Sequence, residues 1–478
     1  MFFKQFYLQG LGHASYLIAS EQTGEGLVFD PRRDVDPYLA EARAQGLRLR
    51  YALDSHGHND YLSGVTQLTV QAGVEALGSA EAGLGYPHRP LRDGEVIDLG
   101  EVRIEVLHTP GHTPEHLSLL VYDRSASDGE PALFLSGGAL LVGDLARPDL
   151  LGGTGQAREA ASAFYQTLCK KVLPLPDHVE VFPTHVAGSL CGGHIGSRLS
   201  TTVGYERRTN PILSVTSEAE FVDAALRTGQ LPAVPPYWRS MRRQNFAGVS
   251  PLGVLSEPPA LRIPAFEAAV ADGAVVVDTR DPAAFGGGHI PGALSVGLGP
   301  NFATWAGTVV PEDRPVLLVL DHPSDLWPAV WDLLRIGYGL PEGWLSGGMP
   351  AWRNAAQELE FLDQITVHEL RRRLEWGEVG LLDVRQPAEW MAGRVAGAAF
   401  LTGGELPSHL EEVPDGDPLA VICGSGYRSS VISSLLAGVP RAAVPGTSRH
   451  LLNVAGGMSA WRSAGYPTVG DATSADGR

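Results

Sequence analysis

Histidine and carboxylate side chains gather in four short polar segments between residues 54 and 185. The first segment, Asp54-Ser-His56-Gly-His58-Asn-Asp60-Tyr61, follows an apolar run. Three more come in order, namely Gly111-His112, Gly143-Asp144 and Phe182-Pro-Thr-His185. Neutral imidazoles together with one carboxylate are donors that a divalent transition metal selects. These segments therefore predict a metal centre built on loops.

A cysteine begins a tight loop near the end of the chain. The apolar run Leu419–Ile422 predicts a buried strand, and an apolar-periodic helix begins just after residue 430. Converging backbone N–H groups, the helix N-terminus and the Arg428 charge all favour a thiolate at Cys423. We therefore predict that Cys423 and Arg428 are catalytic. The predicted sulfur-binding loop comprises Gly424, Ser425, Gly426, Tyr427 and Ser429.

The elements that carry these segments suggest an α/β chain of several domains. The chain has 478 residues, and Val275–Phe285 and Gly347–Trp352 recur as Leu381–Trp390 and Gly456–Trp461. Short β-branched runs alternate with helical patterns, which predicts parallel sheets wrapped by helices. We expect domains at residues 1–245, 262–356 and 363–469, with a proline-rich ordered connector after the first and a frayed tail at 470–478.

Composition limits the classes of partner. Lys and Arg total 36 and Asp and Glu total 54, a net charge of −18, which disfavours nucleic acid and anionic membranes. No apolar segment approaches the length of a membrane span. The three cysteines, Cys169, Cys191 and Cys423, are too few for a disulfide framework. We expect a cytoplasmic protein in a reducing compartment.

The order of the first four segments resembles the metallo-β-lactamase superfamily, which implies an αββα sandwich for the first domain. Two-metal hydrolases of that superfamily carry a histidine directly after the Asp of the first motif, where this chain has Tyr61. A phenol is a poor zinc ligand, so we expect one metal ion. Gly111–Pro114 and Gly143–Leu150 are similar to the persulfide dioxygenases within the superfamily.

This resemblance implies one Fe²⁺ per chain, held by His56, His112 and Asp144, with Zn²⁺ as the alternative. Two histidines and a carboxylate are the facial set of non-haem iron(II) oxygenases. His58, Asp60 and His185 are then outer groups that orient the ligands, or alternative ligands. The loops that face the substrate place five residues as expected contacts: Tyr61, Arg147, Cys191, Arg198 and Tyr205.

The repeated half of the chain resembles the rhodanese family of sulfurtransferases. Asp383-Val-Arg385, Arg394–Ala398 and Gly456–Trp461 match that family in order, and Arg428 stands five residues after Cys423. Tyrosine phosphatases place this arginine six residues after the cysteine, which disfavours phosphate chemistry. In the earlier copy Asp321 is expected at the position of the nucleophile. A carboxylate cannot carry sulfane sulfur, so that copy is predicted to be inactive.

The whole chain is similar to bacterial fusions of a persulfide dioxygenase with rhodanese domains. The resemblance implies oxidation of a low-molecular-weight persulfide, such as glutathione persulfide, by O₂ to sulfite, with sulfane-sulfur transfer to or from thiosulfate at Cys423. It further implies sulfide detoxification and a homodimer. Two alternatives stay open, a zinc thioester hydrolase like glyoxalase II with an added sulfurtransferase, and a sulfur-relay protein without metal-dependent turnover.

Overall fold

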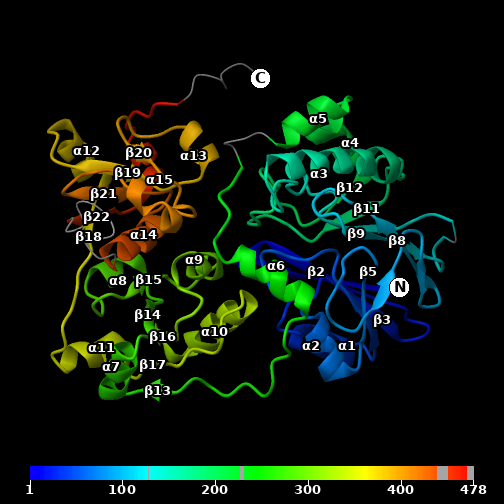
Figure 1. Ribbon diagram of the computed structural model, residues 1–478, viewed down its shortest axis with the longest axis horizontal. Coiled ribbons are helices and arrows are strands. Elements are labelled where there is room, and N and C mark those ends of the chain that lie inside the picture. Colours follow the sequence, from blue (N-terminus) through cyan, green and yellow to red (C-terminus); the bar gives the residue numbers. More distant parts are fainter. Residues whose placement is uncertain (128, 227–230, 439–449, 471–478) are drawn as a thin grey trace. The chain divides into compact units, whose positions relative to one another are not determined.

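A computed structural model of the chain describes residues 1–127, 129–226, 231–438 and 450–470. The predicted tail lies outside the described residues from position 471 onward. The chain divides into two compact units. Unit 1 comprises Met1–Leu231 and Trp238–Leu255, and unit 2 comprises Pro232–Tyr237 and Ser256–Arg478. Figure 1 shows the elements of each unit.

Two six-stranded sheets form the frame of unit 1 within its described residues. In the first sheet β1 to β3 pair antiparallel and β3 to β6 pair parallel, whereas the second is antiparallel except between β10 and β11. The first sheet consists, in spatial order, of β1 (Phe2–Leu8), β2 (His13–Ala19), β3 (Glu25–Phe29), β4 (Arg48–Leu53), β5 (Glu75–Ser79) and β6 (Arg89–Leu91). The second consists of β12 (Thr201–Thr202), β11 (Glu180–Pro183), β10 (Leu133–Gly137), β9 (Leu117–Asp123), β8 (Val102–His108) and β7 (Val96–Asp98).

The two sheets of unit 1 face one another across its main apolar core. Alternate residues of β8, namely Val102, Ile104 and Val106, are buried in this core, as the period-two geometry of a strand requires. Tyr16 of β2 and Phe29 of β3 contribute from the other sheet. Apolar side chains that point the opposite way from each sheet are covered by helices.

Helices cover the outer face of each sheet in unit 1 (Figure 1). Tyr38 of α1 and Leu68 of α2 pack on the first sheet, and Phe164 of α3 and Phe221 of α5 pack on the second. This arrangement confirms the αββα sandwich. The helices of the unit are α1 (Asp36–Ala44), α2 (Val65–Ala72), α3 (Thr154–Thr167), α4 (Val203–Thr209), α5 (Glu218–Ala225) and α6 (Trp238–Ala247).

Unit 2 contains the predicted repeat as two lobes, each with a five-stranded parallel sheet in its described residues. The strand orders match position by position, which confirms the duplicated α/β architecture. The first sheet is β13 (Ala260–Leu261), β17 (Gly343–Leu345), β16 (Val316–Val319), β14 (Val275–Asp278) and β15 (Leu294–Ser295). The second is β18 (Asp363–Ile365), β22 (Leu451–Val454), β21 (Leu419–Ile422), β19 (Gly380–Asp383) and β20 (Ala399–Phe400).

Helices fill the connections between the parallel strands of both lobes, as a parallel strand order requires. In the first lobe they are α7 (Ile263–Ala271), α8 (Pro282–Gly286), α9 (Phe302–Val309), α10 (Leu326–Arg335) and α11 (Gly348–Asn354). In the second lobe they are α12 (Val367–Glu375), α13 (Pro387–Met391), α14 (Tyr427–Gly438) and α15 (Gly457–Ser463).

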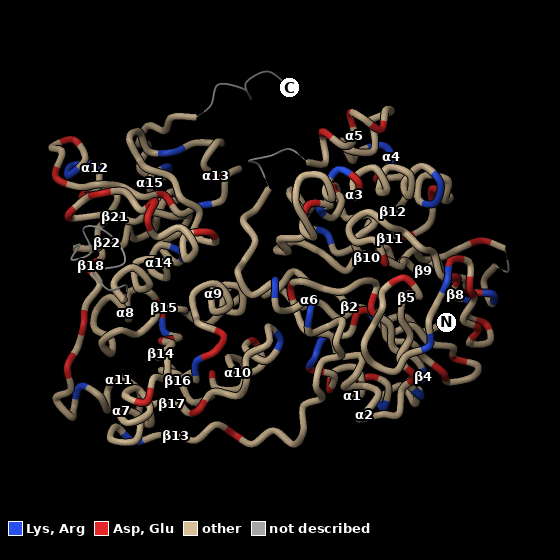
Figure 2. Tube along the Cα trace, in the orientation of Figure 1, with Lys and Arg blue, Asp and Glu red and all other residues tan. Residues whose placement is uncertain are grey.

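Charged residues of both signs are interspersed along the trace of each unit (Figure 2). Within the described residues, no helix is both long enough and apolar enough to pass through a membrane.

The repeated Asp-x-Arg motif forms a buried ion pair at the end of one strand in each lobe. The Arg385 guanidinium donates to both carboxylate oxygens of Asp383 and to the Gly393 carbonyl, at 2.7–2.9 Å. Arg280 bonds Asp278 and Gly288 in the same way. The motif therefore joins the strand end to the loop that precedes the next strand of the sheet.

Arg385→Ala is expected to destabilise unit 2 by roughly 3–5 kcal/mol, because it leaves the Asp383 carboxylate buried without a counter-charge. Urea unfolding followed by near-ultraviolet circular dichroism measures the change. The control is Arg371→Ala, which breaks an exposed pair with Glu375 and should change stability little. Equal effects of the two substitutions would contradict this role of the buried pair.

Candidate metal centre and sulfur-binding loop

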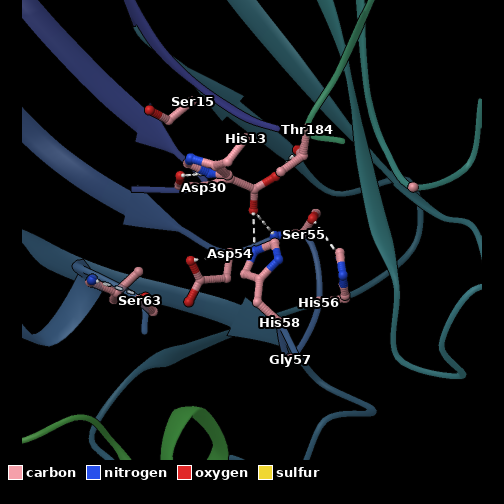
Figure 3. Close-up of polar contacts among 12 residues, drawn as sticks. His13, Ser15, Asp30, Asp54, Ser55, His56, Gly57, His58, Ser63 and Thr184 are labelled. Atoms are coloured by element: carbon pink, nitrogen blue, oxygen red, sulfur yellow. Dashed lines mark hydrogen bonds and ion pairs between the residues drawn. The ribbon is translucent and has the colours of Figure 1, made fainter. Parts of the chain in front are cut away.

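The first histidine motif forms the loop that leaves β4, and Asp30 organises it from the end of β3. One Asp30 oxygen accepts the Ser55 backbone N–H at 2.5 Å and lies 3.1 Å from His58 Nε2, as Figure 3 shows. The other oxygen accepts the Thr184 hydroxyl. Burial lowers the pKa of His58, but the carboxylates of Asp30 and Asp54 raise it above the usual value. His58 is therefore held as a structural ion partner.

Helix α6 fastens this loop from the outside. The Asn245 side chain donates to the carbonyls of His58 and Tyr61 and accepts the Ser63 N–H, all at 2.8–2.9 Å. Arg242 donates to the Gly57 carbonyl and pairs with the Glu115 carboxylate at 3.1 Å. From the sequence, no contact was assigned to this segment. Its function could not be predicted, because these contacts span more than 120 residues.

Three histidines of unit 1 converge on one point. The ligand nitrogens of His56, His112 and His185 lie within 4.8 Å of one another, and all three side chains are buried. Nε2 of His185 is 3.4 Å from Nε2 of His56. Nε2 of His112 is buried and has no hydrogen-bond partner. A buried ring nitrogen without a hydrogen-bond partner, next to two more imidazoles, fits a metal ligand.

A hydrogen bond at Nδ1 of His112 determines which of its two ring nitrogens carries the proton. Nδ1 of His112 lies 2.8 Å from the Arg147 carbonyl, which can only accept, so this nitrogen carries the proton. Nε2 of His112 therefore presents a lone pair to the centre. Nδ1 of His185 lies 3.4 Å from the Asp60 carboxylate and 3.4 Å from the Ser189 hydroxyl. Nδ1 of His56 contacts the Ser55 hydroxyl at 2.8 Å, which permits the same tautomer.

The centre favours uncharged imidazole. Burial, reinforced by the neighbouring histidines, holds the pKa of His56 and of His112 well below the usual value. Burial also lowers the pKa of His116 to about 3. His116 lies beside the centre, but its Nε2 accepts the Gly138 N–H at 2.8 Å, so it is committed to the backbone. Neutral imidazole is the form that binds metal.

Asp144 differs from the prediction, because the structure places its carboxylate elsewhere. One oxygen accepts the N–H groups of Gly193 and His194, at 2.8 and 2.6 Å, and the side chain lines a pocket with Pro148 and Ile212. In the described residues Asp144 joins no group with His56 and His112. His185, expected as an outer residue or an alternative ligand, completes the group instead.

The course of the chain after β10 explains why the Asp144 carboxylate lies away from His56 and His112. Gly138 follows this strand directly beneath the His112 ring, and a Cβ at Gly138 would lie 2.9 Å from His112 Cδ2. The strand end thus offers the centre no side chain. The Gly-Asp motif comes five residues later, on a loop that leads away to Gly193 and His194. The order of motifs in the sequence could not reveal this displacement.

The expected substrate contacts are divided between the centre and the surface. Cys191 is buried with its sulfur within 4.8 Å of ligand atoms of Asp60 and His185, and burial raises its thiol pKa well above the usual value. Tyr61 is buried and its hydroxyl donates to the Asp30 carbonyl at 3.4 Å. Arg147 is paired with Asp149 at 2.7 Å. Away from the three histidines, the Arg198 guanidinium covers the exposed Tyr205 ring.

In unit 2 the Cys423 loop cradles its sulfur as the sequence indicated. The Gly426 N–H donates to Sγ at 3.1 Å, and the Ser429 hydroxyl lies 3.4 Å from it. Burial lowers the pKa of Arg428, but Glu389 and Cys423 raise it to a net value above the usual one. Arg428 bonds the Glu389 carboxylate through two nitrogens, at 2.6 and 2.7 Å. The loop thus places an N–H donor at the sulfur, with the Arg428–Glu389 ion pair beside it.

The first lobe has no nucleophile at the equivalent position. Val319 pairs with Asp278 as Ile422 pairs with Asp383, so the residue that corresponds to Cys423 is Leu320. The expectation that Asp321 takes this place is therefore wrong by one residue, because β16 and the glycine motif fix the register. Leu320 is buried, whereas Asp321 is exposed. A leucine offers no group that can bind sulfur.

The first lobe supports the Cys423 loop. The Tyr427 hydroxyl, from within the loop, donates to the Gly297 carbonyl at 2.8 Å. Ser295 bonds Ser430 and Ser434 of α14, each at 2.9 Å. Helix α14 thus packs on β15 and α9 of the other lobe (Figure 1). The first lobe therefore supports the Cys423 loop and helix α14 of the second lobe by hydrogen bonds and packing.

Known proteins with similar sequences or structures match both units. A crystal structure named as a metallo-beta-lactamase from Staphylococcus aureus shares 30% identity, covers 72% of this chain and 99% of its own, and superposes with a TM-score of 0.65. This chain belongs to the metallo-β-lactamase superfamily. A model described as "Rhodanese-like domain" matches residues 264–355 and 366–464 of unit 2. The predicted fusion of the two kinds of domain is confirmed.

Relatives of the metallo-β-lactamase unit include enzymes of two kinds. A hydroxyacylglutathione hydrolase of a Polaromonas species is 34% identical over 176 residues, which is 36% of this chain and 61% of that protein. The mitochondrial persulfide dioxygenase of Homo sapiens is 29% identical over 214 residues, which is 44% of this chain and 74% of that protein. The likeness to each kind is similar.

The residues at the centre fit one metal ion but not the expected iron set. Three neutral imidazoles are the protein ligands of one class of catalytic zinc sites. The two-histidine, one-carboxylate set of iron(II) oxygenases is not assembled, because Asp144 faces the amides of Gly193 and His194. The Asp60 carboxylate lies 3.4 Å from His185 Nδ1, beside the three imidazoles.

Tyr427→Phe is expected to speed alkylation of Cys423 by iodoacetamide roughly 2- to 10-fold, since one lost hydrogen bond is worth about 0.5–1.5 kcal/mol of loop closure. Peptide mass spectrometry measures the rate at Cys423 itself. Tyr466→Phe is the matched control, because the Tyr466 hydroxyl contacts His368 and not the loop. Unchanged labelling in Tyr427→Phe would exclude the first lobe as a support of the loop.

Proposed function

We propose that this chain handles sulfane sulfur and that Cys423 is the residue that carries it. The supporting observation is the cradle around Sγ, where the Gly426 N–H donates to the sulfur, the Ser429 hydroxyl lies 3.4 Å from it, and Arg428 stands alongside. Such a site stabilises a thiolate, and equally the terminal anionic sulfur of a cysteine persulfide. The match to the rhodanese-like family supports the same chemistry.

The reaction follows from the thiolate. Sγ of Cys423 attacks the outer sulfur of a persulfide or thiosulfate, a new S–S bond forms, and the donor's S–S bond breaks. The donor leaves as a thiolate or as sulfite. The outer sulfur remains on Cys423 as a persulfide until an acceptor such as sulfite, cyanide or a thiolate removes it. Arg428 and the loop N–H groups hold the anionic donor and the product persulfide in place.

Cys423→Ser is expected to abolish thiosulfate-dependent formation of thiocyanate from cyanide, because the serine hydroxyl cannot form a persulfide. Intact-protein mass spectrometry should show one added sulfur on the wild-type chain and none on the variant. Cys169→Ser changes an exposed cysteine and should leave both results unchanged. Persistence of sulfur transfer in Cys423→Ser, with loss in Cys191→Ser, would move the activity to the other unit.

A second function, at the three histidines, is hydrolysis of a thioester of a low-molecular-weight thiol. The donor set favours this over the persulfide oxidation by O₂ that was expected from the sequence, because no carboxylate joins the three imidazoles in the described residues. The hydrolase relative supports the same chemistry. When bound, a zinc ion would supply an acidic water at neutral pH. The Arg147 carbonyl would orient His112 by accepting its Nδ1 proton. The Asp60 carboxylate lies 3.4 Å from His185 Nδ1.

We expect the zinc-loaded protein to hydrolyse a hydroxyacyl thioester of glutathione and the His112→Ala variant to lose that activity. Free thiol release reports the reaction. An oxygen electrode, with glutathione persulfide and iron(II)-loaded protein, tests the competing chemistry under matched conditions. Oxygen uptake that vanishes in His112→Ala, without thioester cleavage, would overturn the hydrolase proposal and establish persulfide oxidation.

A further inference from the structure

We propose that Asn453 is a positioning residue for Cys423, because it binds the one hydroxyl proton of Ser429 and leaves the serine oxygen, without its proton, facing the sulfur. Asn453 lies on β22, and its side chain is buried, as are those of Ser429 and Cys423. It reaches the sulfur loop across 24 residues of sequence. The inference rests on the proposed function only in naming Cys423 as the reactive cysteine.

The orientation of the Asn453 amide is fixed by the two groups that face its nitrogen. Nδ2 donates to the Gly426 carbonyl at 3.1 Å and to Oε1 of Gln364 at 2.8 Å. A carbonyl can only accept, so the atom that faces Gly426 must be the amide nitrogen. Gln364 is oriented in turn, because its Nε2 donates to the Leu362 carbonyl at 3.3 Å. The amide oxygen of Asn453 therefore faces the other way, toward Ser429.

The Ser429 hydroxyl has two neighbours and one proton to donate. Its oxygen lies 2.6 Å from Oδ1 of Asn453 and 3.4 Å from Sγ of Cys423. An amide oxygen offers only lone pairs, and the shorter contact is the stronger hydrogen bond, so the proton lies on the Asn453 side. The serine oxygen thus presents lone pairs to Sγ. It can accept the proton of a thiol, but it does not donate to a thiolate.

The serine oxygen opposes the groups that favour a thiolate. The Gly426 N–H donates to Sγ at 3.1 Å, and the positive Arg428 interacts with the cysteine. By holding the Ser429 proton, Asn453 removes a further donor that would otherwise stabilise the thiolate. Only the thiolate attacks sulfur. Asn453 therefore shifts the acidic limb of the pH dependence of sulfur transfer to higher pH.

The charged groups around the loop leave this effect to the serine and the asparagine. The strands on which the loop begins and on which Asn453 lies, β21 and β22, consist of uncharged residues. Arg428 pairs with Glu389 of α13 at 2.6 Å. The remaining charged or phenolic groups of the neighbouring elements are bonded elsewhere: Asp383 to Arg385, Arg462 to the Gly393 carbonyl, and Tyr427 to the Gly297 carbonyl.

The test uses the full-length chain, reduced with a phosphine and alkylated with iodoacetamide over a range of pH. Peptide mass spectrometry gives the rate at Cys423 alone, and the pH midpoint of that rate reports thiolate formation. In Asn453→Leu the Ser429 hydroxyl is released to donate to Sγ. We expect the midpoint to fall by roughly one pH unit, as for a hydrogen bond to a charged group. An unchanged or higher midpoint would overturn the proposal.

Removal of the serine hydroxyl shows whether Asn453 acts through it. The double variant Ser429→Ala with Asn453→Leu should have the same midpoint as Ser429→Ala, and a further fall would overturn the role of the serine. Ser429→Ala by itself should not raise the midpoint. A rise would mean that the hydroxyl donates to Sγ in the wild type, contrary to the proposal. This variant leaves Asn453 bonded to Gly426, so it decides the matter even where Asn453→Leu does not fold.

Ser433→Ala is the matched control. It is the same substitution one turn further along α14, at a buried hydroxyl that has no hydrogen-bond partner among the described residues. Its midpoint should equal that of the wild type, and a fall as large as in Asn453→Leu would overturn the specific role of Asn453. Near-ultraviolet circular dichroism checks the fold of each variant. Thiocyanate formation from thiosulfate, measured in parallel, tests the proposed function separately, because alkylation does not require sulfur transfer.

Discussion

The direction of one imidazole proton constrains the rest of unit 1. The Arg147 carbonyl accepts from Nδ1 of His112, so the buried Nε2 of His112 faces His56 and His185 as a lone pair without a hydrogen-bond partner. The buried surroundings make this arrangement costly without a cation, because unpaired polar atoms in a low dielectric lose both water and a hydrogen bond. The direction of the His112 lone pair is thus determined by the Arg147 carbonyl on the other side of the ring.

The same principle governs the sulfur site in unit 2. The Cys423 cradle depends on a short loop whose shape is fixed by contacts beyond it. Tyr427 reaches the Gly297 carbonyl of the first lobe, and a Cβ at Gly457 would lie 2.3 Å from the Cys423 carbonyl, so the glycine motif permits α15 to approach the loop. The first lobe has Leu320 at the position where the second lobe has Cys423. It still packs against α14, the helix that follows the Cys423 loop.

The two units carry different reactive groups. Unit 1 brings three buried imidazoles together, and unit 2 holds a cysteine sulfur beside a backbone N–H and an arginine. The Asp144 carboxylate, expected as the third ligand of an iron centre, is bonded to the backbone N–H groups of Gly193 and His194.

Local patterns were enough to predict the fold class and the repeat. Alternating burial along β8 and the strand–loop–helix pattern at Cys423 arise from neighbours in the chain, so the sequence encodes them directly. Which side chains lie beside His56 and His112 depends instead on where β10 ends and where the next loop goes, and Gly138 gives no sign of this by itself. Asn245 and Arg242 fasten the first motif from about 185 residues away. Leu320, not Asp321, occupies the position equivalent to Cys423, because pairing between β14 and β16 sets the register. Residue types fixed which chemistry was available, and long-range packing decided which atoms meet.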